Sequence, residues 1–255
     1  MNGIKGLLCL VGVALVCIPS SGRAADSAPR TYAVISLIGD KINVVGYRAT
    51  TGSNMDRNRQ GAIAVQGRTL DDIAVVAASN AIGRFDPRAS IIMLASNDPA
   101  LYELQDDIFE PTERSRALLG SAIKGPVQAQ HATHLILIRK HRGDAAMRMQ
   151  VQFVGSGKIE GVGFYVDPTL RTRSFETSEI GTGFLAAFAY VKVTLVDATT
   201  MAVIGEQTAE ESATTFTGKS LNPLDALTPA QKTAALRTMI IRATESGVKA
   251  VLESK

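Results

Sequence analysis

The alternation of apolar and polar positions is strongest in the stretch 183–212, where it predicts two long strands joined by a tight turn. One face of the first strand is wholly apolar and the other is mixed. The apolar face holds Val191, Val193 and Leu195, and the mixed face holds Tyr190, Lys192, Thr194 and Val196. The turn is expected at Asp197–Thr200, because short polar side chains bond the nearby backbone. Two strands alone are marginal in water, so we expect the C-terminal helix to cover the apolar face.

That C-terminal helix has the most specific local signal in the chain. Thr228 is placed to cap it, Pro229 takes the first helical position, and Gln231 stands three residues after the cap. Gly247 interrupts the apolar stripe of the helix and indicates close approach to a neighbour; the alternative is a weak point that costs about 1 kcal/mol. The stripe consists of Leu236, Met239, Ile240, Ala243, Val251 and Leu252.

Two further helices are predicted, at 69–84 and 111–124. Thr69 is expected to cap the first, with Asp72 bonding back to the cap. Its inward face would hold Leu70, Ile73, Val76, Ala77 and Ala81. Gly125-Pro126 is expected to end the second helix, because proline lacks the backbone donor.

Further strands are predicted from short apolar or alternating runs. The first two, 31–38 and 41–49, are expected to pair as a hairpin through Gly39-Asp40. The others are a short buried strand at 90–95, a strand at 133–140 and a one-sided strand at 146–154. The glycine-rich stretch 155–183 is interpreted as an irregular insertion, and segments of this kind are commonly functional or mobile.

Together these elements predict an α+β fold with a mixed, largely antiparallel sheet covered by helices. Residues 25–255 would form a single elaborated domain with the insertion at 155–183.

Residues 1–24 have the pattern of a cleavable signal peptide. Lys5 precedes the apolar run Leu7–Ile18, and the small-residue site Gly22-Arg23-Ala24 follows. The run is shorter than the about 20 residues that span a bilayer, so no integral span is expected after cleavage; an uncleaved anchor is the alternative. The expected location is periplasmic or secreted, by Gram-negative-type export.

Removal of the signal changes the composition. Cys9 and Cys17 both lie inside it, so the mature chain would be cysteine-free, without disulfides or thiol chemistry. Val16 before Cys17 argues against lipidation. The signal holds two of the 27 basic residues and no acid, which leaves 25 basic against 24 acidic. This near-balance gives no indication of nucleic-acid or anionic-membrane binding.

Polar residues at two strand ends are the candidate site for chemistry: Asp40, Asn97 and Asp98. Hydrolases of the Gly-Asp-Ser type place a serine after the aspartate, whereas Lys41 stands there. Turn residues are the plainer interpretation. His131 and His134 lack a third ligand for zinc, so neither a metal nor a cofactor is expected.

A candidate interaction surface follows from the apolar residues beside the glycine-rich stretch: Phe164, Tyr165, Phe184, Leu185 and Phe188. Core packing is the alternative, because apolar runs are usually interior. If exposed, these residues would form a patch for a partner, a lipid or a small molecule.

The second half of the chain, from Thr112 onward, resembles the CsgG-like and TolB N-terminal-like periplasmic α/β domains. The resemblance rests on LVDATTMAVIG, residues 195–205, and on AQHATHLILI, residues 129–138. It implies a non-catalytic periplasmic adaptor in envelope assembly or transport.

The favoured hypothesis is a non-catalytic exported protein that binds an envelope component or a partner protein. The alternatives are a secreted hydrolase that uses Asp40, Asn97 and Asp98, and a small-ligand carrier with 155–183 as its lid.

Overall fold

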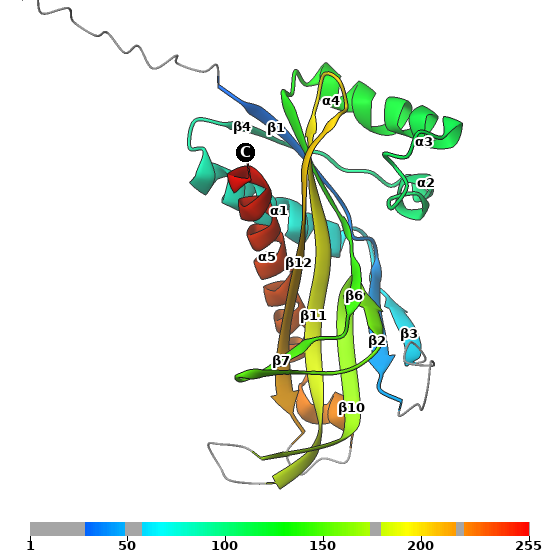
Figure 1. The fold of residues 1–255 in the computed structure, drawn as a ribbon, viewed down its shortest axis with the longest axis vertical. Helices are drawn as coiled ribbons and strands as arrows, with labels where there is room; N and C mark the ends of the chain where they lie inside the picture. The colour runs from blue at the N-terminus through cyan, green and yellow to red at the C-terminus, as the bar shows by residue number, and fades with distance from the viewer. Residues whose placement is uncertain (1–28, 49–57, 174–179, 218–221, 255) are drawn as a thin grey trace, which may run out of the picture.

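A computed structural model describes residues 29–48, 58–173, 180–217 and 222–254, so the predicted signal peptide lies outside the described residues. The fold is α+β, with helices on both faces of a mixed, mostly antiparallel sheet (Figure 1). The sheet strands are β1 (Thr31–Leu37), β2 (Lys41–Gly46), β3 (Arg59–Ala64), β4 (Ser90–Met93), β5 (His134–Lys140), β10 (Val162–Arg173), β11 (Ile180–Asp197) and β12 (Val203–Phe216).

Short strands and helices complete the described chain. The strands are β6 (Arg142–Asp144), β7 (Met147–Met149), β8 (Gln152–Val154) and β9 (Lys158–Glu160). The helices are α1 (Thr69–Phe85), α2 (Pro99–Glu103), α3 (Glu113–Leu118), the π-helical turn η1 (Leu119–Lys124), α4 (Gly125–Ala129), the 3-10 turn η2 (Pro223–Ala226) and α5 (Pro229–Glu253).

β11 organises the sheet, because one of its edges is shared by two strands placed end to end. β12 pairs with the opposite edge from Phe184 to Val196. On the shared edge, β10 pairs with residues 180–189 and β5 pairs with residues 191–197. β2 and β3 continue the sheet beyond β10, which gives a lower block; β1 and β4 continue it beyond β5, which gives an upper block (Figure 1).

Tyr190 marks the boundary between the blocks. Its carbonyl oxygen accepts the N–H of His141 at 3.0 Å, and its own N–H donates to the carbonyl of Gly161 at 2.8 Å. The chain therefore leaves the sheet after β5 and returns at the next position of the same ladder to begin β10. The excursion between them carries β6 to β9.

The predicted long hairpin is confirmed, and so is its turn. Asp197 Oδ1 accepts the N–H groups of Thr199 and Thr200 at 2.9 and 2.7 Å. The mixed face predicted for β11 is not wet, however, because Thr194 is fully buried. A second layer of chain covers that face, which the sequence pattern alone does not show.

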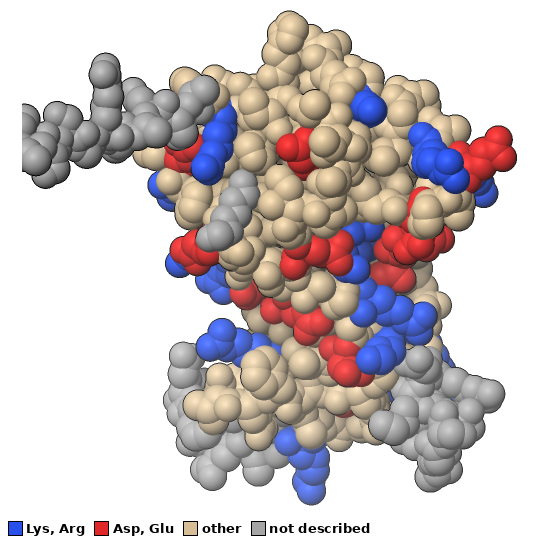
Figure 2. Space-filling view, turned by 45° about the horizontal axis from the view of Figure 1, so that its top comes forward, with Lys and Arg blue, Asp and Glu red and all other residues tan. Residues whose placement is uncertain are grey.

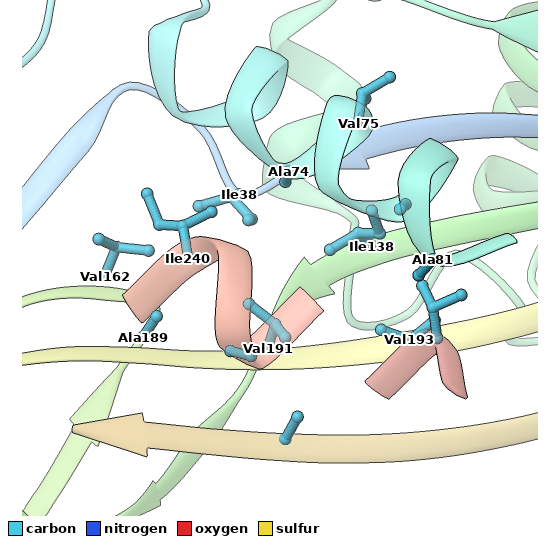
Figure 3. Packing of buried hydrophobic residues seen from close by; sticks show 14 of the residues in the cluster. Ile38, Ala74, Val75, Ala81, Ile138, Val162, Ala189, Val191, Val193 and Ile240 are labelled. Carbon is cyan, nitrogen blue, oxygen red and sulfur yellow. The ribbon is translucent and has the colours of Figure 1, made fainter. Parts of the chain in front are cut away.

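α5 and α1 cover the apolar face of the sheet (Figure 3), and the predicted helix cover is confirmed. Val191 and Val193 of β11 pack there with Ile240 of α5. The capping box is present: Thr228 N–H donates to Gln231 Oε1 at 2.9 Å. A Cβ at Gly247 would lie 2.7 Å from Val193 Cγ2, so the predicted close approach is confirmed.

The opposite face has two separate apolar clusters, one over each block. In the upper block, Leu137 packs with Ile123 and with Leu101 of α2. In the lower block, Phe188 packs with Met147 of the excursion. Between the two clusters lies a narrow polar belt, which we call the waist (Figure 2).

The predicted hairpin of the first two strands is wrong. β1 pairs in parallel with β4 and β5, whereas β2 pairs with β3 and β10. Every residue of 32–37 is buried, as expected for an inner parallel strand with both faces covered. Gly39-Asp40 therefore carries the chain from the upper block to the lower block rather than reversing it.

The prediction of an irregular insertion at 155–183 is also wrong, because the described part of this stretch forms β9, β10 and the start of β11. Its glycines serve close packing as well as turns. A Cβ at Gly163 would collide with the backbone carbonyl of Asn43 and would lie 2.9 Å from the ring of Phe188. Gly163 thus lets β2 and the Phe188 side chain approach β10.

The strand predicted at 146–154 is instead a tight hairpin of β7 and β8. Gln150 takes a positive φ of 52° at its turn, which the periodic pattern does not reveal. The strand predicted as buried at 90–95 is β4, at the edge of the sheet, and Met93 is 60% exposed.

Two helix boundaries differ from the prediction. α1 begins at Thr69, but Arg68 is its N-cap, and the Thr69 hydroxyl donates to Gln66 instead. The second helix passes Gly125-Pro126 without a break, because Gly125 N–H bonds Gly120 in the wider π-helical pattern and helix continues as α4.

We expect Gly163→Ala to lower the free energy of unfolding by about 3 kcal/mol, because the backbone of β2 would have to move. Gly83→Ala in α1 is the matched control. Nothing lies within 4 Å of its Cβ, so it should add up to about 1 kcal/mol. Urea unfolding of both variants measures the difference, and equal effects would contradict the packing role of Gly163.

Candidate functional site

A cleft of about 660 Å³ opens at the waist, where β1 ends and β2 begins. The strand junction forms its floor, the start of α1 and the α2 region form two walls, and the end of β5 closes it. Its lining residues are Ile38, Gly39, Asp40, Lys41, Asn43, Gly67, Arg68, Asp71, Asn97, Pro99, Tyr102, Glu103, Gln105 and Lys140. This volume lies in the range of small-molecule sites in proteins.

Asp71, in the first turn of α1, fixes the floor of the cleft. Its side chain is buried, and Oδ1 accepts the Ser36 hydroxyl at 2.6 Å and the Ile38 N–H at 2.8 Å. The N–H of Gly39 is 3.3 Å from the same oxygen. The carboxyl group therefore satisfies the backbone donors that become free where β1 stops.

Tyr102 of α2 completes this network. Its hydroxyl oxygen lies 2.9 Å from Asp71 Oδ2 and 3.0 Å from the carbonyl oxygen of Ser96. One hydroxyl hydrogen can serve only one of these acceptors. A neutral Asp71 would donate to Tyr102, which would then donate to Ser96, so every group would have a partner.

Burial raises the pKa of Asp71, and the hydrogen bonds from Ser36, Tyr102 and the backbone only partly offset this effect. Burial, followed by the charge of Asp71, raises the pKa of Tyr102 as well. The direction of the Asp71 shift favours its neutral form, whereas the shift of Tyr102 only keeps that hydroxyl protonated.

Arg139 of β5 supports the α2 side of the cleft. Its buried guanidinium donates to the carbonyl of Gln105 at 2.6 Å, to the Thr194 hydroxyl at 3.0 Å and to Glu206 at 2.7 Å. Phe109 covers it, with the ring centroid 5.5 Å away. Burial lowers the pKa of Arg139, and the charge of Glu206 opposes that shift.

Gln105, whose carbonyl accepts the hydrogen bond from Arg139, also bonds two residues that line the cleft. Its Oε1 accepts the N–H of Lys140 at 3.0 Å, and its Nε2 donates to the carbonyl of Tyr102 at 2.7 Å. The wall residue Tyr102 and the closing residue Lys140 are thus held by one side chain.

The rim of the cleft carries charges of both signs. Lys140 pairs with Glu160 at 3.3 Å across the waist, where charged side chains form a band (Figure 2). Lys41 and Asp40 make no ion pair with any described residue. Their charges are therefore available to a ligand.

Two of the three predicted strand-end residues, Asp40 and Asn97, line this cleft. Asp98 does not line it. Its Oδ1 accepts the N–H of Ala100 at 3.0 Å, which makes it the N-cap of α2. The structure therefore brings together two strand ends that are distant in sequence and gives the third residue a capping role.

The predicted apolar surface is corrected, because its five residues lie in the interior. Phe164 is 5% exposed and Phe184 and Phe188 are fully buried. The excursion and the helices cover both faces of the strands that carry them, so core packing describes them. The full set is Phe164, Tyr165, Phe184, Leu185 and Phe188.

Sequence reasoning missed Asp71 and Tyr102. The sequence pattern predicts only a helix start at Asp71 and puts Val76 on the inward face, whereas Val76 is 50% exposed. The available signal was an acid at helical spacing from Ala74 and Ala78, on the face that proves to be buried.

Among the described residues, no group of three or more His, Cys, Asp or Glu side chains could hold a metal ion. No helix in the described ranges is both long and apolar enough to cross a membrane.

Comparisons with known proteins add only distant likenesses. No protein-family model matches the sequence, and no curated protein matches it. The chain is similar to protein XCC0632 from Xanthomonas campestris, of family-model DUF330, with TM-score 0.40, 11% identity and coverage of 88% of this chain and 85% of that one. It is also similar to a hemagglutinin homolog from Helicobacter pylori, with TM-score 0.36, 9% identity and coverage of 93% and 87%.

A third likeness is to PelC from Paraburkholderia phytofirmans, with TM-score 0.32, 10% identity and coverage of 87% of this chain and 89% of that one. At these scores the likenesses carry no argument about ligand or partner.

Asp71→Asn tests the neutral network, because the amide imitates the protonated acid. The raised pKa means that the native state holds this proton more tightly than the unfolded chain does. Its contribution to stability is complete below the unfolded pKa of about 4, and it is lost as the pH rises through the native value. The variant should therefore gain stability relative to the parent as pH rises.

Urea unfolding of Asp71→Asn and of the parent across acidic and neutral pH measures this change. A stability difference that stays constant with pH would contradict the neutral form of Asp71. Asp71→Leu serves as the comparison: it orphans the N–H of Ile38 and should destabilise the protein by about 3 kcal/mol at acidic pH. Because leucine does not titrate either, this deficit should shrink with rising pH in parallel with the Asp71→Asn curve, so that the difference between the two variants stays constant.

Proposed function

We propose that this protein binds a partner protein or envelope component through the waist cleft. The occupant would be a polar segment that carries charges of both signs, such as an exposed stretch of polypeptide, and it would be bound without covalent change. The observation that carries this proposal is the pair Asp40 and Lys41, which stand on the rim of a formed cleft without ion-pair partners among the described residues.

The construction of the cleft supports binding to a preformed site. Asp71 holds its floor and Arg139 holds one wall, each through several short hydrogen bonds. A ligand would therefore meet side chains whose supports are already ordered, which lowers the entropy lost on binding.

Hydrolysis is the alternative function, because Asp40 and Asn97 of the hydrolase hypothesis both line the cleft. Among its lining residues there is no serine, threonine, cysteine or histidine. Ser36 lies close below, but its hydroxyl is buried and donates to Asp71. This composition supports binding over nucleophilic catalysis.

The carrier hypothesis loses its proposed lid. The described part of 155–183 forms strands of the lower block. We propose three further properties together with binding. They are export by a signal peptide, a periplasmic or secreted location, and the role of a CsgG-like or TolB-like adaptor.

A charged tetrapeptide, Gly-Lys-Glu-Gly with blocked ends, is a direct probe of the cleft. In the ¹⁵N-labelled protein we expect amide shifts at Gly39 and Gly67, which line it. Lys41→Glu should weaken binding about tenfold, because it replaces an attractive charge by a repulsive one. The control Lys249→Glu, on the exposed surface of α5, should leave binding unchanged.

Three outcomes would count against the proposal: shifts scattered over the surface, equal weakening by both substitutions, or no shift. Cleavage of the tetrapeptide that Asp40→Asn abolishes would instead establish the hydrolase alternative.

A further inference from the structure

β3 forms an open edge of the sheet. Among the described strands only β2 pairs with it, and all six residues of Arg59–Ala64 are exposed. Ile63 has the largest apolar side chain of the strand and is 58% exposed. An edge of this kind presents unpaired backbone N–H and C=O groups, which are a template for another extended chain.

The ladder with β2 shows which backbone groups of β3 face outward. The Val65 N–H donates to the Asp40 carbonyl at 2.7 Å, so these two opposed residues are joined by a hydrogen bond. Bonded and unbonded pairs alternate along an antiparallel ladder. Ala64 and Ala62, one and three residues before Val65, therefore belong to unbonded pairs, and their N–H and C=O groups point away from β2.

Two other strands at edges of the sheet, β4 and β12, carry the protection that β3 lacks. β4 has only four residues. β12 is long but carries the charges of Glu206, Glu210 and Glu211. Short length and charged side chains both discourage pairing with another chain. β3 has one charged residue, Arg59 at its first position, and no proline.

The open edge leads into the waist cleft. Ala64, the last residue of β3, stands opposite Lys41, which lines the cleft. Gly67 and Arg68 come shortly after Ala64 in the chain and line the cleft as well. Figure 1 shows β3 at the margin of the lower block, below α2, whose Tyr102 forms a wall of the same cleft. One extended chain could therefore lie along β3 and continue into the cleft.

We propose that the partner of this protein is an extended polypeptide segment that adds to β3 as a new edge strand and continues into the waist cleft. Strand addition here rests on the proposed function, because the cleft holds one end of the same segment. Antiparallel pairing is slightly more stable per residue than parallel pairing, so the segment would run outward from the cleft along β3.

Ile63 gives the added strand a preferred side-chain pattern. It stands opposite Ile42, which packs against the apolar cluster under α1 and α5, so both side chains lie on that face of the sheet. A β-branched residue beside Ile63 in the new strand would extend this cluster and cover exposed apolar surface. A segment that alternates threonine and valine fits this edge.

The continuity of edge and cleft favours a free segment over a second copy of the chain. β3 of another molecule is fixed in its own sheet by β2, so it could cover the edge but could not also enter the cleft. The unpaired charges of Asp40 and Lys41 on the rim suit a segment that carries both an acid and a base.

Two peptides with blocked ends separate the edge from the cleft. Gly-Lys-Glu-Gly reaches the cleft alone, whereas Gly-Lys-Glu-Gly-Thr-Val-Thr-Val adds a tail for β3. The longer peptide should bind about tenfold more tightly, because the tail adds backbone hydrogen bonds. In the ¹⁵N-labelled protein it should shift the amides of Ala62 and Ala64 as well as those of Gly39 and Gly67, and it should slow hydrogen exchange at Ala62 and Ala64.

Methylation of alternate backbone nitrogens in the tail is the matched control. One pattern removes the donors that face β3 and should abolish the tenfold gain, whereas the other removes donors that face solvent and should keep it. In the protein, Ile63→Ser should lower the gain about threefold through the lost apolar contact. Val76→Ser, at a site of similar exposure on α1, should leave the gain unchanged.

The pattern of shifts distinguishes the two proposals. Shifts at Gly39 and Gly67 without shifts at Ala62 and Ala64 would overturn strand addition and leave cleft binding in place. Shifts on β3 alone, or at neither pair, would overturn cleft binding and the continuous segment together. Equal binding of the two methylated peptides, or a dimer in sedimentation that the longer peptide does not dissociate, would also overturn strand addition by a partner segment.

Discussion

The shared edge of β11 is the constraint on which the rest of the structure depends. Two strands pair with it end to end, and the change of partner takes place at Tyr190, whose N–H and carbonyl serve the two sides of the break. The next strands outward, β1 and β2, break beside it because each continues its own block. Where β1 ends and β2 begins, the backbone N–H groups have no partner in the sheet. Asp71 accepts two of these N–H groups, so the cleft and its buried acid have one origin.

Local patterns predicted the parts of the fold that local physics decides. The alternation around Val193 and the cap at Thr228 each concern one element, and the close approach at Gly247 shows as a glycine within the apolar stripe of a single helix. Strand pairing was not predictable in the same way. A turn sequence such as Gly39-Asp40 suits both a reversal and a step between blocks, and the choice depends on β5 and β10, which follow much later in the chain.

The candidate site was predictable only in part for a related reason. Asp40 and Asn97 stand at strand ends, where polar residues are visible in the sequence. Asp71 belongs to a helix start, where acidic residues are common for electrostatic reasons, so its burial has no distinct signature. The glycines of 155–183 were ambiguous as well: a missing side chain can give freedom to a loop, or it can admit a neighbour, as Gly163 admits Asn43.

The excursion between β5 and β10 begins and ends at a single rung of the sheet, since His141 and Gly161 also bond each other across its base at 3.1 Å. A segment closed in this way is an insertion whose two ends meet at one place in the sheet. It can be lengthened, shortened or exchanged while the strand order on either side is preserved, provided that the replacement still shields the lower cluster. The order of the strands in the main sheet therefore does not depend on the excursion, to which the hairpin of β7 and β8 belongs.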